Sequence, residues 1–556
     1  FFENPFTRFW ITPDLAINAN IPAYALIPNN AIMPPLDSLA GSAKGLNPLL
    51  RHFGMIIHPP MLYLGFVGFV IPFAFAMAAL AGGDLSTNWI KATRRWALIA
   101  WLFLSLGLML GGRWAYDVLG WGGYWGWDPV ENAAFLPWLM GTAFIHSVMI
   151  QEKRGMLKVW NMFLVVGTFS AVMFGTFATR SGLIDSVHSF ARSPIGTPMF
   201  LFWSTMTFIS IGLIVWRWSR GELKDEHQFA GLLSRETLFV LNNVVFVALA
   251  GAIFWGSFAA PIISETFYNT EITIGTDYYM QVTPPLFLAL FILMGIAPLS
   301  AWGVTSARRL SQALLVPAVL TVALLMYIFL FANTRTPVAL VGYGFVILAG
   351  FVAIYEIYRG AAARHRSKNE NWLQATFALF TRNRRRYGGY IVHLGVTVIG
   401  IGIIGSTIFQ VKTEQSLAVG GTMQLQDYSL RFDGFEQGPA ADGRELTIAN
   451  VTVFRDGQEI SKLRPRMDFF PTSNMTMTIA GAHSTLENDF YVLLNGYDTT
   501  TGTGRFWVYI NPLVNLIWIG GLILIAGTFI SAWPHDALTA QVRERVSGKI
   551  NAGAVA

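Results

Sequence analysis

Residues Trp121–Asn132 read WGGYWGWDPVEN, a tryptophan-rich stretch that leads directly into a long apolar run. Asp128, Pro129 and Glu131 have the spacing of a helix N-cap, a proline at the first helical position and the glutamate of a capping box. We therefore expect a helix to begin at Pro129. Capping alone accounts for both carboxylates, so neither needs a ligand to explain it.

The aromatic side chains of this stretch allow two interpretations. Trp121, Tyr124, Trp125 and Trp127 are either interfacial anchors of a membrane protein or a flat surface for a flat ligand. Three glycines alternate with them and remove side chains where a planar ligand could approach the backbone: Gly122, Gly123 and Gly126. The rest of the chain has to decide between the two.

The composition defines the class of protein. Of the 556 residues, 53% are hydrophobic and only 13% are charged, which is too little polar surface for a water-soluble globule. We predict an all-α polytopic membrane protein, whose partner is the lipid bilayer and not nucleic acid, despite a net charge of +6. The chain has no cysteine, which excludes thiolate metal sites and covalent haem attachment on this chain.

About eleven apolar runs are long enough to cross a bilayer. They begin near Ile56, Trp96, Asn132, Val159, Thr197, Val240, Pro284, Leu314, Val338, Tyr390 and Val508. The opening FFENPF resembles the end of another apolar segment, so we expect further helices upstream.

Basic residues fall on alternate connections between these runs, which indicates the cytoplasmic side. The basic connections include Lys91, Arg94, Arg95, Lys153, Arg154, Arg235, Arg308, Arg364 and Arg384–Arg386. The chain then divides into a helical bundle over 1–410 with an outer tryptophan-rich loop at 113–132, an outer β-rich domain at 411–507, a last membrane helix at 508–533 and a cytoplasmic tail at 534–556. The β assignment rests on alternating segments such as LTIANVTVF.

Two histidines lie within the predicted membrane helices. His146 is about 26 Å from the outer end of its helix at about 1.5 Å per residue. His393 lies at nearly the same depth on a helix of opposite direction. Because an ionisable group in a membrane helix is costly, this depth-matched pair is a candidate functional site.

Two further histidines, His58 and His188, lie at the outer surface and could flank the tryptophan stretch. Two imidazoles on opposite faces of a macrocycle give six-coordinate iron, and arginines suit its propionates, with Arg113, Arg180 and Arg192 as candidates. The sequence is thus compatible with two haem sites, one above the other across the membrane.

Several stretches resemble the CcmF family of haem lyases over about Asn4 to Pro534. They are WGGYWGWDPVEN followed by PWL, LNPLLRHFGMIIHPPMLYLGFVGF, EKRGMLKVWN, GTFATRSGLIDSVHSFA and GGYIVHLGVTVIGIG. The chain departs from the family pattern at Tyr124, where tryptophan is usual, and at Gly126, where an aromatic residue is common.

The resemblance implies an enzyme of the bacterial inner membrane, with its active site on the periplasmic side. Such proteins take haem from the chaperone CcmE and join its vinyl groups to the CXXCH thiols of apocytochrome c, together with thiol-handling subunits of the CcmH and CcmI type. By position, His58 and His188 match the ligands of the delivered haem, and His146 and His393 match those of a resident haem b that would relay an electron. The remaining matched residues bind the delivered haem or act in its transfer: Trp121, Trp125, Trp127, Asp128, Glu131 and Asn132.

Two alternatives stay open. One is a paralogous lyase for an unusual haem-attachment motif. The other is a haem or ion transporter whose intramembrane histidines line a path, although the helices that carry them are otherwise mostly apolar.

Overall fold

The computed structural model describes residues 48–181, 195–270, 272–332, 334–471, 473–498 and 500–534. Within these ranges, eleven helical segments are long and apolar enough to cross a membrane, which confirms the predicted polytopic bundle. Their helices are α2 (Phe53–Gly68) with α3 (Val70–Gly82), α4 (Asn88–Val118), α5 (Pro129–Arg154), α6 (Lys158–Ser181), α7 (Gly196–Ser219), α8 (Arg235–Phe254) with the π-turn η2 (Trp255–Ala259) and α9 (Ala260–Tyr268), α10 (Thr276–Ile296) with η3 (Ala297–Leu299), α11 (Ala307–Phe331), α12 (Pro337–Lys368), α14 (Arg384–Ile408) and α15 (Val514–Ala532). Two short helices complete the set, η1 (Pro48–Leu50) and α13 (Trp372–Arg382).

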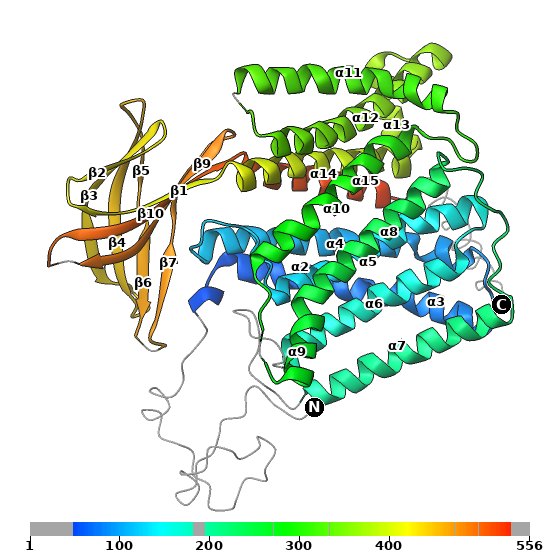
Figure 1. Ribbon diagram of the computed structural model, residues 1–556, viewed down its shortest axis with the longest axis horizontal. Helices are drawn as coiled ribbons and strands as arrows, with labels where there is room; N and C mark the ends of the chain where they lie inside the picture. Colours follow the sequence, from blue (N-terminus) through cyan, green and yellow to red (C-terminus); the bar gives the residue numbers. More distant parts are fainter. Residues whose placement is uncertain are drawn as a thin grey trace, which may run out of the picture.

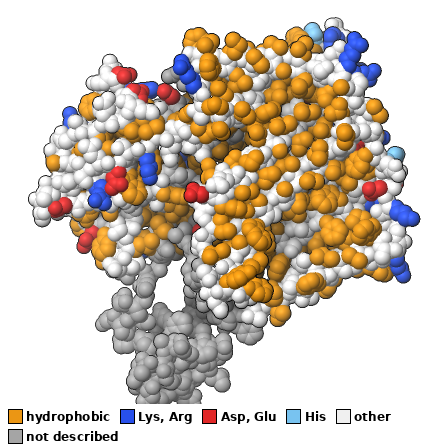
Figure 2. All heavy atoms as spheres, viewed as in Figure 1, with side chains coloured by type: hydrophobic (Ala, Val, Ile, Leu, Met, Phe, Trp, Pro, Cys, Tyr) orange, Lys and Arg blue, Asp and Glu red, His pale blue; other side chains and the backbone are white. Residues whose placement is uncertain are grey.

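The helical bundle has two chemically different ends. Apolar side chains cover its flank, and lysine and arginine gather at the end opposite the strands (Figure 2). We call this the basic end: α5 and α12 finish there, and α8 and α14 begin there. The other end, where all the strands lie (Figure 1), is the sandwich end.

The strands form two antiparallel sheets. One has the order β1-β10-β9-β8 and the other β2-β3-β4-β6-β7, with β5 paired to β4. The bounds are β1 (Val411–Ala418), β2 (Thr422–Leu425), β3 (Tyr428–Pro439), β4 (Glu445–Arg455), β5 (Gln458–Leu463), β6 (Arg466–Phe470), β7 (Met475–Ile479), β8 (Gly481–Ser484), β9 (Asn488–Asp498) and β10 (Thr503–Pro512). Because residues of both sheets share one apolar core, the domain is a β-sandwich.

Strand β9 is buried on both faces, and this fixes the sandwich to the bundle. Phe490, Val492 and Leu494 belong to the core between the sheets. The alternate residues Tyr491 and Leu493 pack with side chains of α4 and α15. Successive side chains of a strand point to opposite sides, so one strand serves both contacts.

Three boundaries differ from the sequence analysis. Residues 508–512 are not the start of a membrane helix but the end of β10, and Val508 lies in the sandwich core. Hydropathy could not separate them, because a strand buried on both faces is as apolar as a helix. The tryptophan loop is also shorter than 113–132: α4 continues to Val118 and α5 begins at Pro129, so the loop is 119–128 and Arg113 lies on a helix.

Candidate functional site

The tryptophan loop, residues 119–128, is closed by the predicted capping box. The Asp128 carboxylate accepts a hydrogen bond from the Val130 amide at 2.8 Å. The Glu131 carboxylate accepts from the amides of Gly126 at 2.9 Å and of Asp128 at 3.3 Å. The helix start expected at Pro129 is confirmed, and both carboxylates hold the loop onto α5.

Replacing Asp128 should therefore act through the cap. Asp128→Ala is expected to lower the free energy of unfolding by about 1 kcal/mol, because the first helical amides lose their acceptor. Asp128→Asn keeps an acceptor oxygen and should retain both stability and activity. Thermal unfolding in detergent, measured beside haem attachment, checks this. An asparagine variant that is stable but inactive would instead show that the carboxylate charge acts on haem.

Trp127 fixes the loop to the neighbouring helices. Its ring stacks on Tyr279 of α10 with centres 4.9 Å apart and planes 1° from parallel. The buried Asn132 amide donates to the Trp127 carbonyl at 2.9 Å and to Ser257 at 2.8 Å. Ser257 lies in the π-turn η2, a feature often found at functional sites. The loop is thus attached to three helices.

The glycines of the loop serve protein packing more than a ligand. A β-carbon on Gly126 would lie 2.2 Å from the Trp121 ring, and one on Gly122 would lie 2.8 Å from the Tyr509 ring. Gly122 also has a φ of +72°, which favours glycine. Among the three, only Gly123 has no atom within 4 Å of that position. From the sequence we expect all three glycines to leave room for a planar ligand, but only Gly123 does so.

A cavity of about 1970 Å³ lies inside the bundle, well above the roughly 300–1,000 Å³ of common small-molecule sites. Its lining reaches from the tryptophan loop to the basic end. The lining residues include Trp121, Gly123, Tyr124, Trp125, Trp127, Phe135, His146, Phe239, Asn242, Phe246, Phe291, His393, Arg94, Arg235, Arg385 and Arg386. Between its ends the wall is largely apolar.

His146 and His393 face one another in this cavity. Their ring centres are 6.3 Å apart and their planes differ by 10°. His146 Nδ1 lies 2.8 Å from the Thr142 carbonyl oxygen. A carbonyl only accepts, so Nδ1 carries the proton and Nε2 holds the lone pair that a metal needs. The two histidines predicted at equal depth are indeed neighbours.

His58 lies elsewhere, against α4. Its Nδ1 donates to the Gly107 carbonyl at 2.7 Å, and its ring is nearly parallel to Trp114, with centres 6.4 Å apart and planes 9° from parallel. Gly107 and Trp114 lie on the face of α4 opposite to Tyr116, which lines the cavity. His58 and the histidine pair are therefore on two sides of one helix. Its expected partner His188 is outside the described residues, as is Arg192.

The two candidate propionate arginines have other contacts. Arg113 forms an ion pair with Asp117 at 3.0 Å and lies over the rings of Tyr116 and Trp518. Arg180 is 3.4 Å from the Tyr63 hydroxyl, near the end of α6. The structure does not bring either arginine to the histidine pair, so a role for them stays a prediction for the outer site only.

A buried polar network joins the tryptophan loop to the sandwich. Asn511, which is 1% exposed, donates to the Tyr116 hydroxyl at 2.9 Å and to the Gly122 carbonyl at 3.4 Å, and accepts from Gln410 at 2.7 Å. Tyr116 in turn donates to the carboxylate of Asp489 at 3.1 Å. Burial raises the pKa of the Asp489 carboxyl group. The loop is therefore positioned by residues far away in the sequence.

Several of these residues were missed by the sequence analysis. Trp114 precedes the tryptophan-rich stretch, and nothing in its neighbours marks it as the ring beside His58. Asn511 and Gln410 flank the β-rich segment and acquire their role only when the sandwich docks. Arg235 was read as an orientation signal, although it lines the cavity.

The protein is a membrane bundle with two facing imidazoles in a large, largely apolar cavity, whose lining includes residues of the tryptophan loop. Comparison with known proteins identifies the group. Residues 24–184 match the family described as "Cytochrome C assembly protein", and residues 408–512 match "CcmF C-terminal beta-sandwich". The chain belongs to the CcmF family of cytochrome c-type biogenesis proteins.

The similarity extends over most of the chain. The protein "Cytochrome c-type biogenesis protein CcmF" of Pseudomonas aeruginosa is 35% identical over 517 residues, which are 92% of this chain and 75% of that one. The Escherichia coli protein of the same name is 32% identical over 507 residues, 91% and 75% of the two chains. A solved structure, "Cytochrome c Heme Lyase CcmF", matches with a TM-score of 0.69 and 29% identity over 87% of this chain and 73% of that one.

Proposed function

We propose that this protein is a cytochrome c haem lyase of the bacterial inner membrane, which takes haem from the chaperone CcmE and joins it to the CXXCH thiols of apocytochrome c. The names of the related proteins support cytochrome c biogenesis. The observation that carries the proposal further is the pair of imidazoles inside an apolar cavity.

The histidine pair fits a resident haem b. Two metal–imidazole bonds of about 2 Å each, together with half of each ring, span about 6 Å, which agrees with the 6.3 Å between ring centres. His393 Nδ1 is a buried polar atom with no hydrogen-bond partner, and the Asn242 amide nitrogen beside the cavity is another. When bound, this haem would supply a one-electron carrier, which is how the family's proposed relay to the delivered haem would operate.

The delivered haem is the substrate, and we place its site at the sandwich end, around His58. The Gly107 carbonyl fixes the tautomer of His58 with its lone pair on Nε2, and the neighbouring Trp114 ring keeps the imidazole oriented. The tryptophan loop lies at the same end with its rings toward the cavity on the other side of α4, and we propose that it holds the edge of the porphyrin during transfer. Since this chain has no cysteine, the thiols arrive with the apocytochrome, and each S–H adds across a vinyl C=C without a leaving group.

The orientation follows from charge. The basic end carries the arginines and lysines that are typical of a cytoplasmic surface, and this supports a periplasmic position for the sandwich and the tryptophan loop. There the sandwich can meet CcmE, and the thiol-handling CcmH and CcmI proteins that would present the apocytochrome. Of these partners, the chaperone CcmE is the one that we expect to dock on the sandwich.

Haem attachment in a reporter strain tests the function. The full chain is produced in bacteria that lack their own lyase of this family, together with an apocytochrome bearing CXXCH. We expect covalent haem on the reporter, seen by haem staining after denaturing electrophoresis, and at least a tenfold loss for His58→Ala. His483→Ala in β8 is the matched control and should retain activity. A wild-type chain that attaches no haem would contradict the proposal.

A second candidate is a lyase for an unusual attachment motif. The chain is also 30% identical over 496 residues to "Cytochrome c-type biogenesis protein NrfE" of Haemophilus influenzae, which keeps a paralogous role in cytochrome c biogenesis as the alternative. The same reporter assay separates the two when it is run with apocytochromes of different motifs. Attachment to CXXCH excludes a lyase restricted to another motif. By contrast, the apolar middle of the cavity disfavours an ion transporter, which needs polar groups along its path.

A further inference from the structure

The buried carboxylates at the basic end of the bundle have basic side chains as partners. Glu152 pairs with Arg94 at 3.0 Å and with Arg385. Glu236 pairs with Arg154 at 2.7 Å. The side chains of these two acids are only 8% and 2% exposed, so they bring no uncompensated charge into the protein.

The third buried carboxylate of this region, Glu356, is shared by two arginines. It pairs with Arg359 at 2.7 Å and with Arg386 at 2.7 Å, and it accepts from the Tyr390 hydroxyl at 3.0 Å. Its side chain is 3% exposed. All three buried acids therefore already have cationic partners.

Arg235 lines the cavity and is a partly buried cation. In the described part of the chain no carboxylate forms an ion pair with it. One guanidinium nitrogen donates to the Pro298 carbonyl at 2.8 Å, and the group lies over the Trp302 ring. Its Nε atom is buried and has no hydrogen-bond partner. A partly buried cation with an unsatisfied donor, facing a cavity, is costly unless an anion joins it.

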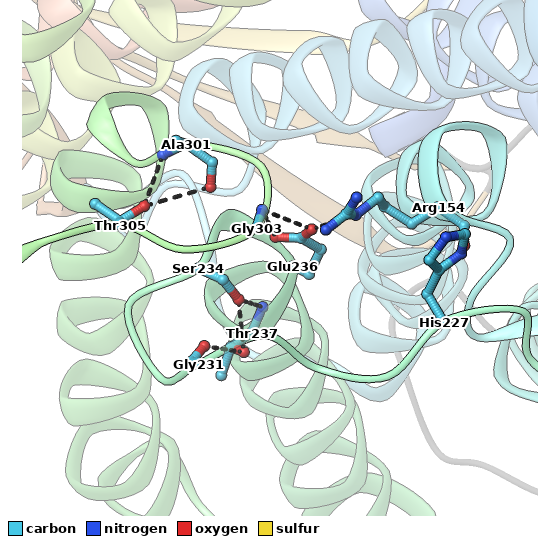
Figure 3. Close-up of polar contacts among 9 residues, drawn as sticks. All are labelled: Arg154, His227, Gly231, Ser234, Glu236, Thr237, Ala301, Gly303 and Thr305. Carbon is cyan, nitrogen blue, oxygen red and sulfur yellow. Dashed lines mark hydrogen bonds and ion pairs between the residues drawn. The ribbon is translucent and has the colours of Figure 1, made fainter.

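Several hydrogen bonds hold the start of α8 and so fix the position of the Arg235 backbone. Ser234 caps the helix by accepting from the Thr237 amide, and Glu236 accepts from the Gly303 amide at 2.9 Å as well as from Arg154 (Figure 3). The Arg235 amide itself donates to the Ala301 carbonyl at 3.0 Å. These contacts tie α8 to the end of α5 and to the loop after η3.

The cavity face of α8 connects Arg235 to the histidine pair. Arg235, Phe239, Asn242 and Phe246 follow one another at helical spacing, and all four line the cavity. The Phe239 ring meets His146 edge-on with centres 5.9 Å apart, and the Phe246 ring is 6.4 Å away from it. Arg235 is thus one helical turn closer to the basic end than a residue in contact with His146.

We propose that Arg235 binds a propionate carboxylate of the haem held by His146 and His393. This rests on the proposed function, because the ligand is the resident haem. The guanidinium supplies a charge-assisted bond to the carboxylate and satisfies the buried Nε donor. The carboxylate edge of the macrocycle then points to the basic end, and its apolar edge points toward the tryptophan loop.

Redox titration of the purified full chain tests the assignment. Arg235→Gln should keep the low-spin spectrum of bis-histidine haem but shift the midpoint potential downward, since loss of a nearby positive charge favours the oxidised form. A tenfold change in the equilibrium corresponds to about 59 mV for one electron. Arg235→Lys keeps the charge and should shift less. Arg308→Gln, an exposed arginine at the same end, is the matched control and should leave the potential unchanged.

A binding measurement on the wild type makes the test independent of the variant's folding. Protein produced in cells unable to make haem is titrated with haem and with its dimethyl ester, which has no carboxylate. We expect at least tenfold tighter binding of haem by the wild type and near-equal binding by Arg235→Gln. Equal binding of both compounds by the wild type, or an unshifted potential in Arg235→Gln, would overturn the assignment. If the wild type binds neither compound with a low-spin spectrum, the resident haem itself is excluded.

Discussion

Replacing either His146 or His393 by alanine should remove the low-spin b-type spectrum of the purified protein. The two rings are 6.3 Å apart in an apolar cavity, and the described residues around them offer no third imidazole. One remaining ligand would leave the iron five-coordinate and weakly held. We expect at least a tenfold loss of haem per protein, measured by the pyridine haemochrome assay and by oxidised and reduced spectra.

Chemical rescue sharpens this experiment. The cavity is large enough for free imidazole to enter beside a His393→Gly variant, so added imidazole should restore part of the low-spin spectrum. His483→Ala, in the sandwich, is the control and should keep full haem content. A colourless wild-type protein would contradict the resident haem. Unchanged lyase activity in a His146→Ala, His393→Ala double variant would exclude the electron relay and leave the outer site to act alone.

Asn511→Ala should uncouple the tryptophan loop from the sandwich. Asn511 is 1% exposed and bonds Tyr116, the Gly122 carbonyl and Gln410. Its loss would leave buried partners unsatisfied, at a cost of about 1–3 kcal/mol for each group. We expect a lower unfolding temperature in detergent, faster amide hydrogen exchange in residues 119–128 and a loss of haem attachment of about tenfold or more.

The haem b spectrum separates this effect from general damage. The histidine pair lies nearer the basic end, so Asn511→Ala should retain the resident haem while attachment falls. Asn450→Ala, which removes a surface contact with Glu436 on the other sheet, should change neither property. If exchange in the loop stays at the wild-type rate, the sandwich does not position the loop.

The membrane helices could be predicted because they depend on local properties. Hydropathy, the positions of basic residues and the capping pattern at Asp128 can each be read from a short stretch of sequence without knowledge of the packing. The pairing of His146 with His393 was also within reach, because helix rise converts position into depth. The depth of a residue does not determine the direction in which its side chain points around the helix axis. Only the packing of the helices shows that both rings face the same cavity.

The boundary near Val508 was wrong for a related reason. An apolar run indicates that its residues are buried, but not what buries them. Strands β9 and β10 pack on the second sheet with one face and on α4 and α15 with the other. No local pattern distinguishes this from the beginning of a membrane helix.

The sequence by itself therefore determined the class of protein, the helical bundle, the loop cap and the candidate histidines. Tertiary structure alone decided that His58 packs beside Trp114 on the far side of α4, that Asn511 anchors the tryptophan loop, and that Arg235 has no acidic partner among the described residues. The physical reason is the range of the interactions: hydropathy acts within one membrane span and capping within one helical turn, whereas ring stacking, buried hydrogen bonds and charge matching join residues separated by tens to hundreds of positions.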